Sequence, residues 1–502
     1  MRYILAIDQG TTGTRAVVFD EKLNQRWSSY MEHRQISPQP GWTEHDPMEI
    51  LENTCTVIRQ VLEQARDAGV RLEQIVCAGM ANQGETTVAW DRITGEPLSN
   101  AVVWHCTRSS QIAQRLQAVP GFDALVRERT GLMIDSYFSA TKMVWLRENV
   151  PAVRQALEEG RALFGTLDSW LIWKLTQRQS YVTDAATASR TMLFNIHTMD
   201  WDDDILAQLE LSRSTLPQVL NNCAAFGTAK IPLDGGVFEL PILGSIVDQQ
   251  GALFGQFCFD AGMIKATYGT GCFVLMNTGD KPVYSQHGLL TSVGWQLADR
   301  KCYVLDGAIY MAGAVMQWLR DKLGLIEQYS DLDRNALSLP DNGGVYFVTA
   351  FSGLSAPIWD PNARGTIVGM TTNTTRAHVV RAALESVAYQ VKQLLDCFQS
   401  DTRLPLQLLR ADGGITRSMF LMQFQADLLD LPVTLMRSCE ATAKGVAMLA
   451  GLQAGIFSGL DELSRLQETD RIYRPDLSVE RRSQLLRDWN CAVERAKGWE
   501  NR

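Results

Sequence analysis

The chain lacks the sequence marks of a secreted, zinc-bound or membrane-spanning protein. Its ten cysteines include no Cys-x-x-Cys pair, and its six histidines form no cluster at metal-binding spacing. This pattern predicts reduced thiols and argues against a structural zinc site. The sequence contains no run of about 18 apolar residues and no basic start followed by an apolar block. We therefore expect a cytoplasmic protein without a membrane segment.

An excess of positive charge is also missing. Lysine and arginine number 47 against 56 aspartates and glutamates, which gives a formal net charge of −9. Because the chain carries no basic tract, nucleic acids and anionic membranes are poor candidate partners. With 502 residues, 46% of them apolar, the chain is longer than one hydrophobic core usually supports, and at least two domains are expected.

The most informative stretch is residues 4–19, where two apolar, β-branched runs flank Gly10-Thr11-Thr12-Gly13. This pattern predicts a strand, a tight turn and a returning strand. Glycine amides and threonine hydroxyls can donate to a phosphate, and Asp8 at the strand end can hold a hydrated cation. No Walker motif occurs in the chain. The alternative is an ordinary hairpin turn.

The second half repeats this pattern weakly at residues 263–276, around Gly269-Thr270-Gly271. The repeat favours a duplicated domain architecture. Asp248 follows an apolar strand at 240–247, where it is either a helix N-cap or a catalytic carboxylate. Asp412-Gly413-Gly414 ends another predicted strand, and a third exposed backbone turn of this kind suits the ribose and base of a nucleotide.

These segments together resemble the FGGY carbohydrate kinases, and among them the members that phosphorylate glycerol. The resemblance covers essentially the whole chain. The strings that carry it most specifically are residues 137–146, 165–174, 188–196, 248–250, 268–273 and 365–385.

The resemblance implies an α/β fold of two ribonuclease-H-like (actin-type ATPase) domains with a central cleft. The expected domains are residues 1–250, with the polyol site and first phosphate loop, and 251–502, with the nucleotide site. The implied reaction is ATP-dependent phosphorylation of a small polyol, foremost glycerol to glycerol 3-phosphate, with Mg²⁺ as cofactor. A homo-oligomer, either a dimer or a tetramer, is usual for such kinases.

The resemblance also implies roles for individual residues. Asp248 would be the general base and Asp8 would act on the Mg²⁺ side. The polyol would contact Gly84, Glu85, Trp104, Tyr137, Asp248, Gln249 and Phe273. The nucleotide would contact Thr11, Thr12, Gly13, Arg15, Gly269, Thr270, Gly313, Gln317, Gly414 and Ser418.

Five positions depart from the family pattern. Gly84 stands where an arginine grips substrate hydroxyls, and Trp104-His105-Cys106 replaces Trp-Gln-Asp. Gly13 replaces a serine, and Ser418 replaces an asparagine near the adenine.

Removing the arginine at position 84 deletes up to five donors and leaves space. Either His105, Arg108 or water fills this space around glycerol, or the pocket takes a longer polyol or ketose such as erythritol, threitol or a pentulose. A non-catalytic sugar-binding or actin-like paralogue is a third alternative.

Overall fold

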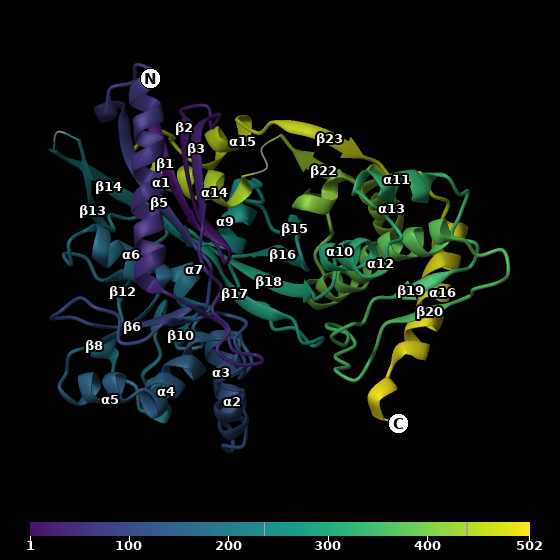
Figure 1. Cartoon of the computed structure of the whole chain (residues 1–502), viewed down its shortest axis with the longest axis horizontal. Coiled ribbons are helices and arrows are strands. Elements are labelled where there is room, and N and C mark those ends of the chain that lie inside the picture. Colours follow the sequence, from purple (N-terminus) through teal and green to yellow (C-terminus); the bar gives the residue numbers. More distant parts are fainter. Residues whose placement is uncertain (235, 438–439, 502) are drawn as a thin grey trace.

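Two large β-sheets, one from each half of the chain, form the framework of the protein (Figure 1). The computed structural model describes residues 1–502 except 235, 438–439 and 502. The first sheet has the order β13–β14–β5–β1–β2–β3. Its strands are β1 Tyr3–Gln9, β2 Gly13–Asp20, β3 Gln25–Glu32, β5 Ile75–Asn82, β13 Gly227–Leu233 and β14 Gly236–Val247.

The second sheet has the order β17–β18–β16–β15–β21–β22–β23. Its strands are β15 Ile264–Tyr268, β16 Cys272–Gly279, β17 Leu290–Gln296, β18 Lys301–Ile309, β21 Leu409–Asp412, β22 Val433–Met436 and β23 Thr469–Tyr473.

The two sheets share one topology. Strand β1 is antiparallel to β2 and parallel to β5, which is parallel to β14. In the same way β15 is antiparallel to β16 and parallel to β21, which is parallel to β22. The expected duplication is confirmed, and each sheet places a glycine-threonine turn at the end of its first parallel strand.

Helix α1 (Pro47–Asp67) begins with residues that are typical of a helix start. The Asp46 carboxylate accepts hydrogen bonds from the amides of Met48 and Glu49, and Pro47 occupies the first turn, where its missing N–H costs nothing. The apolar positions of the helix face inward and are buried: Ile50, Val57, Ile58, Val61 and Leu62. This face covers β2 and β3.

Helix α14 (Ala441–Gln453) belongs to the second half of the sequence but packs against β1, β5, β14 and α9 (Asp248–Gly255) of the first half (Figure 1). A Cβ added to Gly445 would overlap the carbonyl of Gly251. Glycine therefore lets α14 and α9 touch backbone to backbone. The expected domain boundary at 250/251 falls inside α9, and that boundary remains a prediction.

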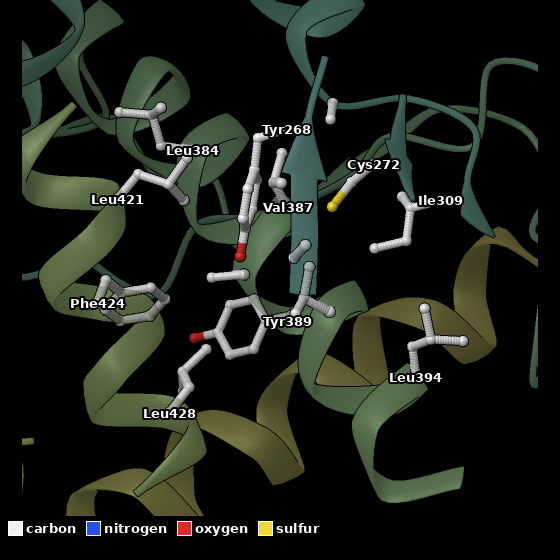
Figure 2. Packing of buried hydrophobic residues seen from close by; sticks show 14 of the residues in the cluster. Tyr268, Cys272, Ile309, Leu384, Val387, Tyr389, Leu394, Leu421, Phe424 and Leu428 are labelled. Atoms are coloured by element: carbon white, nitrogen blue, oxygen red, sulfur yellow. The ribbon is translucent and has the colours of Figure 1, made fainter. Parts of the chain in front are cut away.

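The core of the second half lies between its sheet and the helices α12 (Arg376–Thr402) and α13 (Met419–Leu429). Figure 2 shows Tyr268 and Tyr389 pointing between these elements, next to Phe424 and Leu428. The Tyr268 hydroxyl is buried and donates to Gln425 Oε1 at 2.9 Å. The C-terminal helix is α16 (Val479–Ala496), which buries Leu485, Trp489 and Val493 on one face.

The other elements complete the two halves. A small sheet, β4–β7–β6–β8, lies beside the first sheet. The remaining strands are β4 Glu44–His45, β6 Thr87–Asp91, β7 Ala101–Val102, β8 Ala162–Thr166, β9 Val182–Asp184, β10 Phe194–Asn195, β11 Asp200–Trp201, β12 Gln218–Leu220, β19 Tyr346–Val348 and β20 Thr366–Val368. The remaining α-helices are α2 Ser110–Gln117, α3 Phe122–Thr130, α4 Ser139–Asn149, α5 Pro151–Glu158, α6 Leu167–Leu175, α7 Ala185–Ala188, α8 Asp203–Gln208, α10 Gly313–Asp321, α11 Ser330–Leu337 and α15 Leu460–Arg465. Within the described part of the chain, no helix combines the length and the apolar character needed to cross a membrane.

Candidate active site

Two carboxylates meet at the carboxyl ends of the parallel strands of the first sheet. Asp8 lies near the end of β1, and Asp248 follows β14 directly. Burial, followed by the charges of Asp248 and Glu440, raises the pKa of Asp8 to about 7. Burial also raises the pKa of Asp248, against the opposing charge of Lys265. The site therefore concentrates negative charge in a place that water reaches poorly.

Asp248 is the first residue of α9 rather than its N-cap. The cap position is Val247, which provides no side-chain cap bond. The Asp248 carboxylate accepts a hydrogen bond from the amide of the next residue, Gln249, at 2.6 Å. The capping interpretation is therefore wrong by one residue, because Asp248 lies inside α9 and Val247 holds its cap position.

The turn between β1 and β2 is fixed from behind. The Thr11 carbonyl accepts hydrogen bonds from His33 Nε2 and Gln35 Nε2, both at 2.9 Å, and the Thr12 carbonyl accepts one from the His33 amide at 3.1 Å. Trp104 Nε1 donates to Thr11 Oγ1 at 3.0 Å. These bonds hold the turn in one conformation before any ligand arrives.

Gly13, one of the departures from the family pattern, has no room for a side chain. A Cβ at this position would overlap the Met31 carbonyl and would lie 2.6 Å from the Tyr30 hydroxyl. Arg15 forms an ion pair with Glu440 and lies over the Tyr30 ring, 5.1 Å from its centroid. Position 13 therefore offers a ligand only its backbone, because β3 packs too closely on β2 to admit a serine.

Two of the expected polyol residues, Glu85 and Tyr137, contact a guanidinium that sequence reasoning missed. Arg190 Nε donates to Glu85 Oε1 at 2.7 Å, and its Nη1 donates to Ser292 Oγ at 2.8 Å. Nη1 also lies 3.2 Å from Asp306 Oδ2, and the guanidinium lies 5.7 Å from the centroid of the Tyr137 ring. Arg190 stood inside the string 188–196, but nothing in that string assigned it a role.

The aromatic residues expected to form the apolar walls do lie together. The Trp104 ring packs edge-on against Tyr137, with centroids 5.6 Å apart, and against Phe273, with centroids 6.4 Å apart. Phe273 comes from β16 in the second half of the chain. The walls of this candidate polyol pocket are therefore drawn from both halves.

Gln249 is held by a second missed cation, Lys265. The Lys265 ammonium donates to Gln249 Oε1 at 2.7 Å and to Thr267 Oγ1 at 3.0 Å. Burial lowers the pKa of Lys265, while the charges of Asp412 and Asp248 oppose that shift. Its only sequence signal was one charge within the apolar strand 263–268.

On the nucleotide side, the second glycine-threonine turn lies against the start of α10. The amide of Gly313 donates to the Gly269 carbonyl at 2.9 Å, and the amide of Ala314 donates to the Thr270 carbonyl at 3.0 Å. A Cβ at Gly313 would lie 2.6 Å from the Gly269 carbonyl. Gln317 is exposed on the same helix, and Gly414 faces open space.

Three further residues weighed for the site have other partners. The Ser418 hydroxyl caps α13 through the Leu421 amide and donates to Asp333. Arg108 pairs with Glu44 Oε1 at 2.7 Å and does not reach the Glu85 group. His105 is exposed, with its ring edge against Trp104.

The residues at the first turn fit Mg²⁺ held mainly by phosphate and water. In the described part of the chain, no three His, Cys, Asp or Glu side chains are grouped so that they could hold a metal ion. Mg²⁺ usually binds through one or two carboxylates and substrate phosphates. Asp8, whose pKa is raised to about 7 by burial and by neighbouring negative charge, would gain from such a cation.

The duplicated sheets and the paired glycine-threonine turns define a protein of the ribonuclease-H-like, actin-type ATPase class. Within this class, the N-terminal domain of the FGGY family of carbohydrate kinases matches residues 3–255, and the C-terminal domain of that family matches residues 264–454. The chain belongs to the FGGY family of carbohydrate kinases.

Individual relatives agree with this assignment. The chain is 48% identical to glycerol kinase 2 of Thermotoga maritima over the full length of both chains. Its structure matches the crystal structure of Plasmodium falciparum glycerol kinase with ADP, with a TM-score of 0.93 and 38% sequence identity. The match covers 99% of this chain and 98% of that one. A xylulose kinase from Lactobacillus acidophilus shares the fold at 22% identity and a TM-score of 0.86, covering 98% and 97% of the two chains.

Proposed function

We propose that the chain transfers the γ-phosphoryl group of ATP to a hydroxyl of glycerol, giving glycerol 3-phosphate. The observation that carries this proposal is the position of Asp248 between two groups of residues. Burial is the main cause that raises the pKa values of Asp8, Glu85 and Tyr137, and the charge of Asp248 contributes to each shift, so Asp248 lies near both the phosphate side and the polyol side. The relatives named glycerol kinase, 46–48% identical over nearly the whole chain, support glycerol as the acceptor.

Asp248 is the proposed general base. The attacking hydroxyl must lose its proton as it approaches the γ-phosphorus in line, and a carboxylate within hydrogen-bond reach can accept that proton. The carboxylate must be ionised to do so. Lys265 and Arg190 favour the ionised form because their positive charges lower the pKa of Asp248 against the effect of burial.

The other residues of the site position the reactants. Glu85, Tyr137 and Gln249 are placed to bind hydroxyls, with Trp104 and Phe273 as the walls along the carbon chain. We assign the phosphates to Thr11, Thr12, Gly13, Arg15, Gly269 and Thr270, and the nucleoside to Gly313, Gln317, Gly414 and the backbone of Ser418. Fixed donors around the transferred group lower the barrier because they need no reorganisation during the reaction.

Asp8 would hold Mg²⁺ on the phosphate side, and this ion, when bound, would supply charge neutralisation for the phosphates. Asp8 itself would keep the metal next to the first turn. Its backbone is tied into the sheet through the pairing of β1 with β2 and β5, so its position does not depend on a mobile loop.

The proposal is tested by measuring ADP release from Mg-ATP with glycerol, dihydroxyacetone, erythritol, threitol, ribitol, ribulose and xylulose. We expect the highest kcat/KM for glycerol. The control is Asp248→Asn, which keeps the shape of the side chain and removes the base. If a longer polyol or a ketose gives the highest kcat/KM, the acceptor is wrong. If no compound exceeds the control, the chain is not a kinase of this kind.

Three further points belong to the same proposal. We expect residues 1–250 and 251–502 to act as the polyol and nucleotide domains. We expect a dimer or tetramer, which light scattering would measure. We place the protein in the cytoplasm, in keeping with an ATP substrate and with the free thiols at all nine cysteines that the structure describes.

A further inference from the structure

Gly84 lies close to a neighbour, Val247, that would have to move to admit a side chain. A Cβ built on Gly84 would lie 2.8 Å from Val247 Cγ2 and 4.0 Å from Arg190 Cγ. The backbone of Gly84 is outside the left-handed region, so an L residue would suffer no conformational strain there. Lack of space, rather than backbone geometry, therefore requires glycine at this position.

Val247 is poorly able to move aside. It is 2% exposed and pairs with Asn82 of β5 at the end of β14. The next residue is Asp248, so a shift of Val247 would also displace the proposed base. The position that a Cβ at residue 84 would take is thus blocked by a valine methyl group.

The Arg190 side chain passes near Gly84 and brings its guanidinium to Glu85, the next residue. It is 3% exposed and its contacts with Glu85, Ser292 and Asp306 use Nε and Nη1. Nη2 takes part in none of these contacts, which leaves two N–H groups that can donate to a hydroxyl. Because Ser292 and Asp306 lie on β17 and β18, both halves of the chain hold this guanidinium in place.

We propose that Arg190 provides the guanidinium of the polyol pocket and that Val247 closes the space beside Gly84, so that the pocket is fitted to a three-carbon polyol. This inference rests on the proposed kinase function and names the residues that set its acceptor. On this proposal, Val247 and Arg190 together take the place of a side chain at position 84. The glycine therefore creates no room for a longer substrate.

The spatial part of the proposal is tested with Gly84→Ala, Val247→Ala and the double variant. Gly84→Ala should lower kcat/KM for glycerol about 100-fold, since a displacement near 1 Å at the base has that effect. Adding Val247→Ala should recover about tenfold or more of this decrease. Val247→Ala alone should raise the ratio of erythritol to glycerol turnover. Gly459→Ala is the matched control, because a Cβ there meets nothing within 4 Å.

The guanidinium part is tested with Arg190→Gln and Arg190→Lys. Arg190→Gln should raise the KM for glycerol about 100-fold, as expected when a charged donor to a hydroxyl is removed, and leave the KM for ATP unchanged. Arg190→Lys should restore part of the glycerol affinity. If Arg190→Gln fails to fold, the measurement is repeated on Arg190→Gln combined with Asp306→Asn, which removes the charges of Arg190 and Asp306 together.

Three results would overturn the inference: full activity of Gly84→Ala, no recovery on adding Val247→Ala, or an unchanged glycerol KM in folded Arg190→Gln. These tests apply once the wild-type protein has been shown to phosphorylate a polyol. Failure of the wild type on every polyol would instead overturn the proposed function.

Discussion

Trp104 Nε1 donates a hydrogen bond to Thr11 Oγ1 at 3.0 Å, which joins a wall of the candidate polyol pocket to the candidate phosphate turn. The backbone amide of Trp104 also donates to Thr86 Oγ1 at 3.1 Å. The Thr86 hydroxyl in turn donates to Gln83 Oε1 at 3.0 Å. A ligand that presses on the indole would therefore act on the turn through a direct contact.

Replacing Trp104 with phenylalanine keeps an aromatic wall but removes the indole N–H. We expect the barrier to glycerol phosphorylation to rise by about 1 kcal/mol, so that kcat falls roughly fivefold, because the turn is then held by one fewer hydrogen bond. ATP hydrolysis without polyol should rise relative to transfer. Steady-state assays with and without glycerol measure both rates.

The matched control for this bond is Thr11→Val, which removes the acceptor. The double variant should lose no more activity than the more affected of the two single variants. Residues in direct contact show such coupling in a double-mutant cycle. Fully additive effects would show that the indole acts only through its ring.

Asp248→Asn removes the proposed base without changing the volume of the side chain. We expect kcat to fall by about 10²- to 10⁴-fold, with little change in the KM for ATP. Thermal stability should be preserved or raised, because the variant no longer buries a charge whose pKa is raised by desolvation. Activity within about tenfold of wild type would show that another group takes the proton.

Lys265→Met tests the charge balance around Asp248. Lys265 opposes the upward pKa shift that burial imposes on Asp248. Without this cation the pKa of Asp248 rises further, so a larger fraction of the base is protonated at any acidic pH. The acid limb of the kcat/KM profile should therefore move to higher pH. Lys392→Met, at an exposed ion pair with Asp396 on α12, should leave the profile unchanged.

Much of the framework could be predicted from local sequence. Glycine positions and β-branched runs predict the first hairpin and its weak repeat around Gly269. Capping chemistry predicts the start of the helix after Asp46. Boundaries are harder to predict: the apolar run at residues 101–104 predicts a strand of that length, whereas β7 spans only Ala101–Val102. Its short length reflects pairing with two-residue β4, which sequence periodicity does not report.

The site could be predicted only in part, because its charges come from distant segments. Arg190, Asp306 and Glu85 are far apart in sequence, and no local pattern pairs them. From the sequence, Gly13 and Gly84 each suggest a missing side-chain interaction. In the structure a neighbour occupies the space beside each glycine, Tyr30 in one case and Val247 in the other. A glycine and the distant residue that fills the space beside it can be recognised as a pair only when the structure shows both positions.

Ser418→Ala separates helix capping from nucleotide binding. The hydroxyl caps α13 at the Leu421 amide, 3.1 Å away, so its removal should cost about 1 kcal/mol of stability. Since the same hydroxyl is engaged with Asp333, we expect no change in the KM for ATP. Calorimetry and steady-state kinetics on one preparation measure both quantities. A raised ATP KM with unchanged stability would assign Ser418 to the base.

Arg108→Met decides whether Arg108 serves the fold or the polyol. Its guanidinium pairs with Glu44 and lies 4.2 Å from the Trp42 ring centroid and 4.9 Å from that of Trp145. The Arg108 side chain is 3% exposed and that of Glu44 is 15% exposed. Breaking a buried pair leaves one charge without compensation, so the variant should lose about 3–5 kcal/mol and its Tm should fall by roughly 10 °C.

Below the new Tm, we expect the KM of Arg108→Met for glycerol to stay at the wild-type value, because Arg190 and not Arg108 contacts Glu85. Arg213→Met is the matched control. That arginine pairs with Asp200 and Asp203 at the surface, where its own side chain is 42% exposed, and such pairs contribute about 1 kcal/mol or less. An increase in glycerol KM without a drop in stability in Arg108→Met would place Arg108 in the pocket and leave Val247 and Arg190 with a packing role only.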